Sequence, residues 1–117
     1  MSKIIRISKL KKRQEFLIVS KEGRYVNCNN FILQFHKRPS SIGSNKNLVR
    51  YGITASKKVG NAILRNKAKR RIRVLISEIF PKFATKGFDY VIIAKNSLNK
   101  SNFFDLKIEV TKTLKNI

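Results

Sequence analysis

Hydrophobic residues in the first half of the chain change from a helical spacing to a strand alternation and then stop at a polar loop. After Ser8, which can cap a helix, apolar residues recur at helical intervals among lysines until Gly23, which favours a helix end. Residues 24–28 and 31–36 are instead rich in Tyr, Val, Phe and Ile, and the two asparagines between them suit a tight turn. The pattern predicts a short helix, two antiparallel strands and a loop over residues 37–47.

The second half of the chain alternates between strands and helices. Residues 48–55 resume a strand pattern, and residues 59–80 have an apolar stripe at helical spacing, in a helix that Pro81 is expected to end. An apolar run over residues 88–95 suits a strand covered on both faces, and residues 102–114 return to helical spacing. We therefore predict an α/β (α+β) two-layer sandwich with the order α-β-β-β-α-β-α and a four-stranded sheet. The apolar stripe consists of Leu64, Ala68, Ile72, Leu75 and Ile79.

The segment from Lys57 to Arg73 carries eight Lys or Arg residues and no Asp or Glu. Its cations share one helix with the apolar stripe, so one side can be buried while the other stays charged. Like charges four residues apart weaken a helix, and no acid here compensates them. Such a cluster is expected to meet a polyanion, and a nucleic acid is the natural candidate. The alternative is a merely solvated charged face, against which the missing acids argue.

The whole chain is strongly basic: its 117 residues include 27 Lys or Arg and 6 Asp or Glu, for a formal net charge of +21. That length fits one domain, and the charge favours a partner with a phosphate backbone. No apolar run approaches the roughly 20 residues of a membrane-spanning helix, and the N-terminus has no signal-like apolar region. We therefore expect a cytoplasmic protein without a membrane partner. The single cysteine, Cys28, rules out an intramolecular disulfide and a cysteine-rich zinc site.

Side chains suited to catalysis are scarce in this sequence. The six acids show no obvious carboxylate pair, and no Ser/His/Asp set or metal-ligand spacing can be assembled. His36, the only histidine, is expected at a strand end facing a loop or solvent. The protein alone is therefore expected neither to catalyse a reaction nor to bind a small-molecule substrate. It is not expected to hold a metal either, although Asn61 could form a weak site.

Several motifs resemble the protein subunit of bacterial ribonuclease P. The family's R-N-R-x-K-R helix follows a strand that ends in S-K-K, and here residues 65–70 read RNKAKR after SKK at residues 56–58. The basic L-K-K-x-x-x-F element at residues 10–16, the FILQF and DYVIIA strands and a terminal helix come in the family's order and spacing. Lys67 stands where the signature has its second arginine, which keeps the charge but loses the planar guanidinium.

The resemblance implies a fold and a function. The fold is ribosomal-protein-like, with a left-handed βαβ crossover between the strands at residues 48–55 and 88–94. The chain would form a single RNA-binding domain, residues 1–117, in which residues 1–7 are flexible. The function is that of the protein subunit of ribonuclease P, which binds the catalytic RNA and assists removal of the 5′ leader from precursor tRNA. The holoenzyme is the endoribonuclease, its RNA subunit carries the chemistry, and Mg²⁺ is held mainly by that RNA.

The basic helix is the first of two expected RNA-binding surfaces. Its cations would form a stripe roughly 12 Å long, at about 1.5 Å rise per residue. Asn66 could bond a 2′-hydroxyl or a base edge, and backbone N–H groups near Gly60 could take a phosphate. The expected contact residues are Lys57, Lys58, Asn61, Arg65, Asn66, Lys67, Lys69, Arg70 and Arg73.

The second surface, implied by the resemblance, is a cleft between the first helix and the sheet that takes the single-stranded leader. Phe16 matches an aromatic position there, where a stacked base contributes roughly 1–3 kcal/mol, and ordinary core packing is the alternative. Relatives often carry an aromatic residue at the position of Ser20 and a tyrosine at that of Gln34. Weaker stacking, or compensation by hydrogen bonds from Gln34, is therefore expected. The expected lining is Lys11, Lys12, Phe16, Ile32, Gln34 and Thr54.

Two other classes of protein remain open from the sequence. A ribosomal protein or general RNA chaperone would share the size and charge but would not prefer precursor to mature tRNA. A self-sufficient nuclease would cut RNA without an RNA subunit, and the lack of an acid/base pair and metal ligands argues against it.

Overall fold

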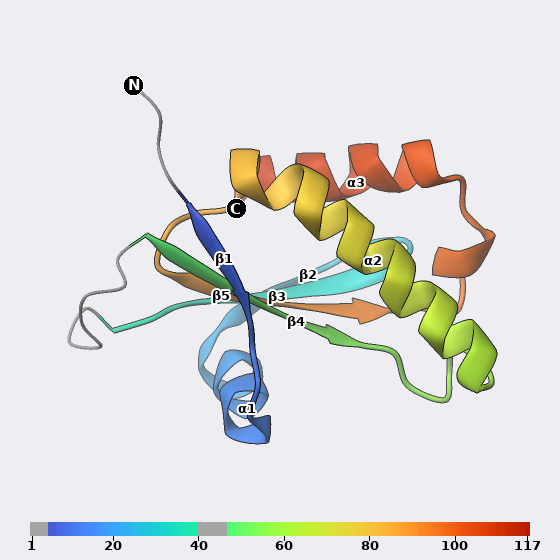
Figure 1. The fold of residues 1–117 in the computed structure, drawn as a ribbon, viewed down its shortest axis with the longest axis horizontal. Helices are drawn as coiled ribbons and strands as arrows, with labels where there is room; N and C mark the ends of the chain where they lie inside the picture. Colours follow the sequence, from blue (N-terminus) through green and yellow to red (C-terminus); the bar gives the residue numbers. More distant parts are fainter. Residues whose placement is uncertain (1–4, 40–46) are drawn as a thin grey trace.

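A five-stranded mixed sheet forms the centre of the molecule (Figure 1). The computed structural model describes residues 5–39 and 47–117, so most of the loop expected over residues 37–47 lies outside the described residues. The strands lie in the order β1-β4-β5-β3-β2, with β4 parallel to β1 and β5, and β3 antiparallel to β5 and β2. Their bounds are β1 Arg6–Lys9, β2 Arg24–Asn27, β3 Phe31–Lys37, β4 Leu48–Thr54 and β5 Phe88–Ala94.

Helices cover both faces of this sheet, so the arrangement has a third layer beyond the two predicted. Helix α1, Arg13–Glu22, packs on β3 and β5 from one side. Helices α2, Ala62–Phe83, and α3, Phe103–Lys115, pack together on the other side, after the short 3-10 helix η2, Leu98–Lys100 (Figure 1). Helix α2 joins the parallel strands β4 and β5, and the handedness of that crossover stays a prediction. None of the helices in the described residues is long and apolar enough to cross a membrane.

The predicted four-stranded sheet is wrong because residues near the N-terminus form a fifth strand. Strand β1 pairs in parallel with residues 48–51 of β4. Arg6 and Ile7 therefore belong to the sheet, not to the flexible segment expected over residues 1–7. Ser8, expected as a helix cap, lies inside the same strand. The sequence RISK gave no strand signal because Ile7 is its only residue with a strong strand preference.

Helix α1 begins at Arg13, later than the sequence predicted, and its first turn is organised by Glu15. The Glu15 carboxylate accepts the backbone N–H groups of Lys11 and Lys12 at 2.7 and 2.9 Å. A helix start leaves such donors without partners, so these bonds favour a start at this point. The helix ends at Gly23, as predicted.

Helix α2 continues past Pro81, which lies in its last turn instead of ending it. The carbonyl O of Phe80 accepts the N–H of Ala84 at 3.0 Å, and both residues are buried. Packing thus holds this turn although proline removes one helix N–H. At the other end Leu64, expected in the buried stripe, is 40% exposed because α2 extends beyond the sheet there (Figure 1). The rest of the stripe, Ala68, Ile72, Leu75 and Ile79, is buried as predicted.

Strand alternation divides the interior into two apolar clusters. On the side of α2 and α3, the buried residues include Leu33, Tyr90 and Ile92. On the side of α1, Val91 packs with Leu10 and Val19. Successive residues of β5 point to opposite faces, so the apolar run of this strand serves both clusters. The prediction of a strand covered on both sides is confirmed.

Candidate nucleic-acid interface

The basic segment begins at a capped helix N-terminus. Gly60 has φ +140°, a conformation that favours glycine, and a Cβ there would meet Leu64 Cδ1 at 2.5 Å. Asn61 caps α2, because its Oδ1 accepts the N–H of Leu64 at 3.0 Å. The N–H groups of Ala62 and Ile63 have no partner among residues 5–39 and 47–117, which leaves them available to an anion. The Asn61 oxygen is thus engaged as the helix cap, and the weak metal site suggested for this residue stays a prediction.

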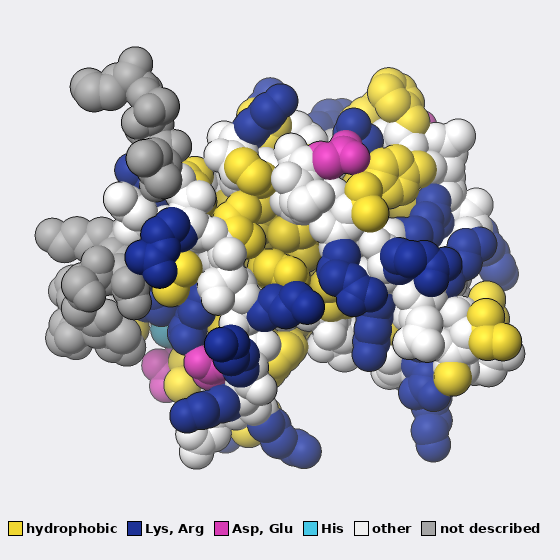
Figure 2. Space-filling view, viewed as in Figure 1, with side chains coloured by type: hydrophobic (Ala, Val, Ile, Leu, Met, Phe, Trp, Pro, Cys, Tyr) yellow, Lys and Arg dark blue, Asp and Glu magenta, His cyan; other side chains and the backbone are white. Residues whose placement is uncertain are grey.

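The predicted RNA-binding side chains follow the basic segment, and most of them are exposed. Figure 2 shows dark blue Lys and Arg side chains across the face that carries α2, with few magenta acids among them. Within the part of the chain that the structure describes, none of these predicted cations forms an ion pair. The exposed members are Lys57, Lys58, Asn61, Asn66, Lys67, Arg70 and Arg73, and the half-buried ones are Arg65 and Lys69.

Arg71 lies in the same segment but is used inside the protein. Its guanidinium donates to the carbonyl O of Leu98 at 2.6 Å and to that of Ser101 at 2.7 Å. It also stands over the Phe103 ring, 5.9 Å from the centroid. These contacts tie α2 to η2 and to the start of α3. Arg71 therefore fixes the position of the basic helix, whereas its neighbours keep their charges for a ligand.

The predicted cleft residues of the sheet share the face that α1 covers. The strand register places Ile32, Ile93 and Thr54 side by side across β3, β5 and β4. Gln34 lies next to Val91 in the neighbouring row. Residues two apart in a strand point to the same face, so Ile32, Gln34 and Thr54 do come together as the sequence predicted. Ile93, which the sequence analysis did not single out, fills the middle of their row.

Phe16 lies over Gly52 at one side of this face. A Cβ on Gly52 would stand 2.3 Å from Phe16 Cε2, so the ring occupies the space of the missing side chain. Phe16 also packs on the cluster formed by Leu10, Val19 and Val91, yet it is only half-buried. The Phe16 ring therefore packs against the core and still leaves part of its surface accessible. Core packing and ligand binding are compatible for this residue.

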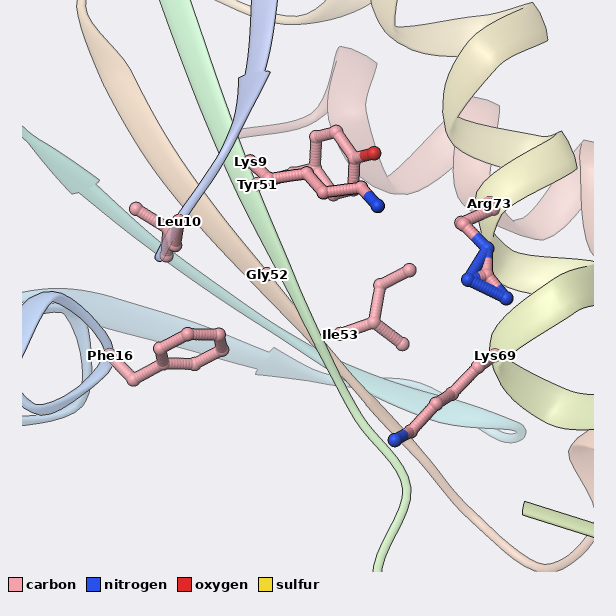
Figure 3. A pocket seen from close by; sticks show the side chains of 8 residues that line it. All are labelled: Lys9, Leu10, Phe16, Tyr51, Gly52, Ile53, Lys69 and Arg73. Carbon is pink, nitrogen blue, oxygen red and sulfur yellow. The ribbon is translucent and has the colours of Figure 1, made fainter. Parts of the chain in front are cut away.

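A pocket of about 190 Å³ connects the Phe16 ring with the basic side of α2 (Figure 3). It lies beside β4, because β1 pairs only with residues 48–51 and leaves residues 52–54 without a described strand on that side. Figure 3 shows Lys69 pointing from α2 toward this edge and Arg73 lying alongside α2. The pocket thus brings Phe16 of the predicted cleft together with Lys69 and Arg73 of the predicted basic surface. The other predicted cleft residues do not line it: Lys11, Lys12, Ile32, Gln34 and Thr54. Its lining is Lys9, Leu10, Phe16, Tyr51, Gly52, Ile53, Lys69 and Arg73.

Ion pairs anchor α1, and with it Phe16, to the sheet. Arg50 donates from Nη1 to Glu15 Oε2 at 2.8 Å, and from Nε and Nη2 to the two oxygens of Asp89 at 2.8 and 2.6 Å. Arg38 Nη1 donates to Asp89 Oδ1 at 2.7 Å. The backbone N–H of Lys12 is the main cause that holds the pKa of Glu15 below its usual value. The hydrogen bond to Asp89 raises the pKa of Arg50 above its usual value, so Glu15 and Arg50 both stay charged.

Known proteins share this arrangement. The family model described as Ribonuclease P matches residues 5–117 of the chain. The chain belongs to the ribonuclease P protein family. The ribonuclease P protein component of Paramagnetospirillum magneticum is 35% identical over 112 residues, which cover 96% of this chain and 84% of the relative. That of Ruegeria pomeroyi is 38% identical over 99 residues, which cover 85% of this chain and 76% of the relative.

The fold agrees with that of a solved ribonuclease P protein. The structure from Thermotoga maritima superposes with a TM-score of 0.76 at 29% identity and covers 93% of this chain and 96% of that one. The family resemblance found in the sequence is therefore confirmed, and so is its assignment to tRNA processing as a subunit of ribonuclease P. The roles of individual site residues stay predictions.

Five residues of the ribonuclease P protein pocket were not predicted from the sequence as ligand contacts: Lys9, Leu10, Tyr51, Gly52 and Ile53. Tyr51 and Ile53 were placed on one strand face by their alternation, but nothing in the pattern showed that this face meets α2 at an open edge. Lys9 comes from β1, the strand that the sequence analysis missed. Lys9 reaches the pocket because β1 pairs in parallel with β4, and no local pattern in the sequence predicts that pairing.

His36 and Cys28 do not line this pocket. His36 is half-buried near the end of β3, and its Nδ1 is buried without a hydrogen-bond partner in the described residues. Cys28 Sγ lies 3.4 Å from Thr113 Oγ1. In the part of the chain that the structure describes, no three His, Cys, Asp or Glu residues are grouped to hold a metal.

Replacing Gly52 with alanine should displace the Phe16 ring, because the new Cβ would stand 2.3 Å from Phe16 Cε2. We expect the free energy of unfolding, measured by urea denaturation, to fall by about 1–3 kcal/mol, as in other overpacked sites. The matched control is the same substitution in a Phe16→Ala background, where no ring opposes the Cβ and the cost should largely disappear. An equal cost in both backgrounds would show that the ring does not fill this space.

Proposed function

We propose that this chain binds the catalytic RNA of ribonuclease P through α2 and the 5′ leader of precursor tRNA through the face under α1. The observation that carries the proposal is the pocket that Phe16 of α1 lines together with Lys69 and Arg73 of α2 (Figure 3). An aromatic ring beside two cations suits a single-stranded nucleic acid, because bases stack on the ring while phosphates pair with the cations. The name of the curated relatives, ribonuclease P protein component, supports an RNA subunit as the partner.

In this proposal the exposed side of α2 follows the phosphates of the RNA subunit. The stripe from Arg65 to Arg73 is about 12 Å long, at about 1.5 Å per residue. Asn66, exposed among these cations, can bond a 2′-hydroxyl or a base edge, which gives a contact of a kind that lysine cannot supply. If about six phosphates are neutralised, the slope of log K against log salt is near −4 to −5.

The leader crosses the row formed by Ile32, Ile93 and Thr54. This row is mostly apolar, so the ribose-phosphate chain gains little from it and the base contacts carry the interaction. The Phe16 ring can stack on any base, as suits an enzyme that must accept many leaders. Lys11 and Lys12 are exposed just before α1 and can pair with leader phosphates.

The chemical step belongs to the RNA subunit in this proposal. Magnesium prefers oxygen ligands and keeps several waters, and RNA phosphates supply such oxygens. The donor atoms of the described protein residues do not fit a dedicated metal site, so we derive no step through a protein-bound metal. The protein orders the leader and screens phosphate repulsion, which helps the RNA at low Mg²⁺. We place this activity in the cytoplasm.

Reconstitution with an RNA subunit tests the proposal. Purified protein, a bacterial ribonuclease P RNA and precursor tRNA are combined at low Mg²⁺, and cleavage products are separated by electrophoresis. We expect cleavage at the 5′ end of the mature tRNA that requires both macromolecules. Cleavage by the protein alone, or an RNA rate that the protein does not raise, would contradict the proposal.

Binding to precursor and mature tRNA separates this function from general RNA binding. The holoenzyme should bind precursor tRNA more tightly, because only the precursor carries a leader for the face under α1. A ribosomal protein or RNA chaperone would bind both RNAs equally well.

A further inference from the structure

Tyr25 is an exposed aromatic residue on the same face of the sheet as the proposed leader-binding surface. It lies in the edge strand β2 and is 69% exposed. Its partner on β3 is Gln34, and directly opposite residues of an antiparallel pair point to the same face. The register continues from Gln34 to Val91 and then to Gly52. Tyr25 therefore stands at one end of a row that crosses β2, β3, β5 and β4.

Phe16 stands over the other end of this row, because its ring lies against Gly52. Adjacent strands are about 4.8 Å apart, so three spacings separate Tyr25 from Gly52 by about 14 Å. At about 3.4 Å per stacked nucleotide, this distance spans about four nucleotides, and fewer where the strand is extended. The two rings are thus spaced to take different bases of one strand.

A fixed cation lies beside Tyr25 on this face. Asn27, two residues farther along β2, accepts a hydrogen bond from Lys95 Nζ through its Oδ1 at 2.5 Å. Two residues along a strand are about 7 Å, a distance that lets a base reach the ring while a neighbouring phosphate reaches the ammonium. Glu15 and Glu22, the acids of α1, line a separate pocket with Arg38 and Asp89. Val91, in the middle of the row from Tyr25 to Gly52, is buried under Leu10 and Val19. The open route from Phe16 to Tyr25 therefore follows the neighbouring row, which holds no acid and consists of Thr54, Ile93, Ile32 and Asn27.

We propose that Tyr25 is a second stacking platform for single-stranded RNA, extending the leader-binding surface from Phe16 across the sheet to the edge strand β2. The inference rests on the proposed leader-binding function. A structural role does not account for the residue, because its ring is largely exposed and its hydroxyl makes no hydrogen bond to a residue that the structure describes. Gln34 beside it offers hydrogen bonds but no ring, so the aromatic surface at this end comes from Tyr25.

Fluorescence tests this proposal directly, because the chain has no tryptophan. In a reconstituted holoenzyme, a Tyr25→Trp indole should be quenched by precursor tRNA with a leader of about ten nucleotides and not by mature tRNA. The matched control is Phe104→Trp, since Phe104 is 66% exposed on α3, at the opposite face of the sheet. Its signal should not distinguish the two RNAs. Equal quenching of both indoles by precursor tRNA, or no quenching at position 25, would overturn the proposal.

Affinity measurements separate this inference from the proposed function. Tyr25→Ala should weaken holoenzyme binding of precursor tRNA about 5- to 10-fold, with no change for mature tRNA, and Tyr25→Phe should restore most of the loss. If Phe16→Ala weakens precursor binding and Tyr25→Ala does not, the second platform is wrong while the leader-binding surface stands. If neither substitution affects precursor binding, the leader-binding proposal itself fails. A Tyr25→Ala loss that is equal for both tRNAs would indicate a structural role and would also overturn the inference.

Discussion

Replacing Arg65, Lys69 and Arg70 with glutamine should flatten the salt dependence of binding to ribonuclease P RNA by about two units in the slope of log K against log salt. Each phosphate contact contributes about 0.7–0.9 to that slope, so three lost contacts account for the change. The helix itself should survive, since none of these side chains has an ion-pair partner among the described residues and glutamine is a good helix former. Filter binding over a salt series measures the slope, and circular dichroism checks the helix.

The control removes the same number of charges from other parts of the surface. Lys37, Lys82 and Lys112 are exposed at the end of β3, near the end of α2 and on α3. Their replacement with glutamine gives a variant with the same net charge as the first triple variant, but the slope of log K against log salt should stay nearly that of the unsubstituted protein. If both triple variants flatten the slope equally, the RNA senses the total charge of the protein and α2 is not the contact surface.

Local periodicity was sufficient to predict most of the elements. Helix α2 and strands β3, β4 and β5 carry long apolar patterns that match their buried faces. These elements can therefore be predicted without knowing their tertiary contacts. Strand β1 is different, because its four residues hold one strongly apolar side chain and its order comes from parallel pairing with residues 48–51, distant in sequence. The predicted number of strands was therefore wrong because β1 is ordered by long-range pairing and has no local strand pattern.

In the candidate site, too, some features follow from residue type and others depend on tertiary contacts. The charges of α2 can be read from residue type alone, because clustered cations without acids are visible in any conformation. The pocket cannot be predicted this way, since Phe16 and Lys69 line one pocket only because β1 ends early and leaves the β4 edge open. Likewise, nothing in the run of arginines distinguished Arg71, whose donors are taken by Leu98 and Ser101, from neighbours that stay free.

Asp89→Asn should cause the largest loss of stability among single substitutions of charged residues. Asp89 is 3% exposed and accepts hydrogen bonds from Arg38 and Arg50. Asparagine keeps the shape but leaves two cations facing a neutral amide, and the side chain of Arg38 is only 8% exposed. Breaking a buried pair in this way costs about 3–5 kcal/mol, which urea denaturation measures as a lower free energy of unfolding. Because Arg50 also holds Glu15, the start of α1 should loosen as well.

Glu78→Gln provides the matched control for Asp89→Asn, because both raise the formal net charge from +21 by one. Glu78 pairs with Lys107 at 2.8 Å, but the two side chains are 43% and 41% exposed, so solvent screens the pair and its loss should cost about 0–1 kcal/mol. General charge repulsion would destabilise both variants alike, whereas an uncompensated buried cation destabilises only the first. A large loss confined to Asp89→Asn would therefore show that this scarce acid holds α1 and Phe16 in place, and equal losses would contradict it.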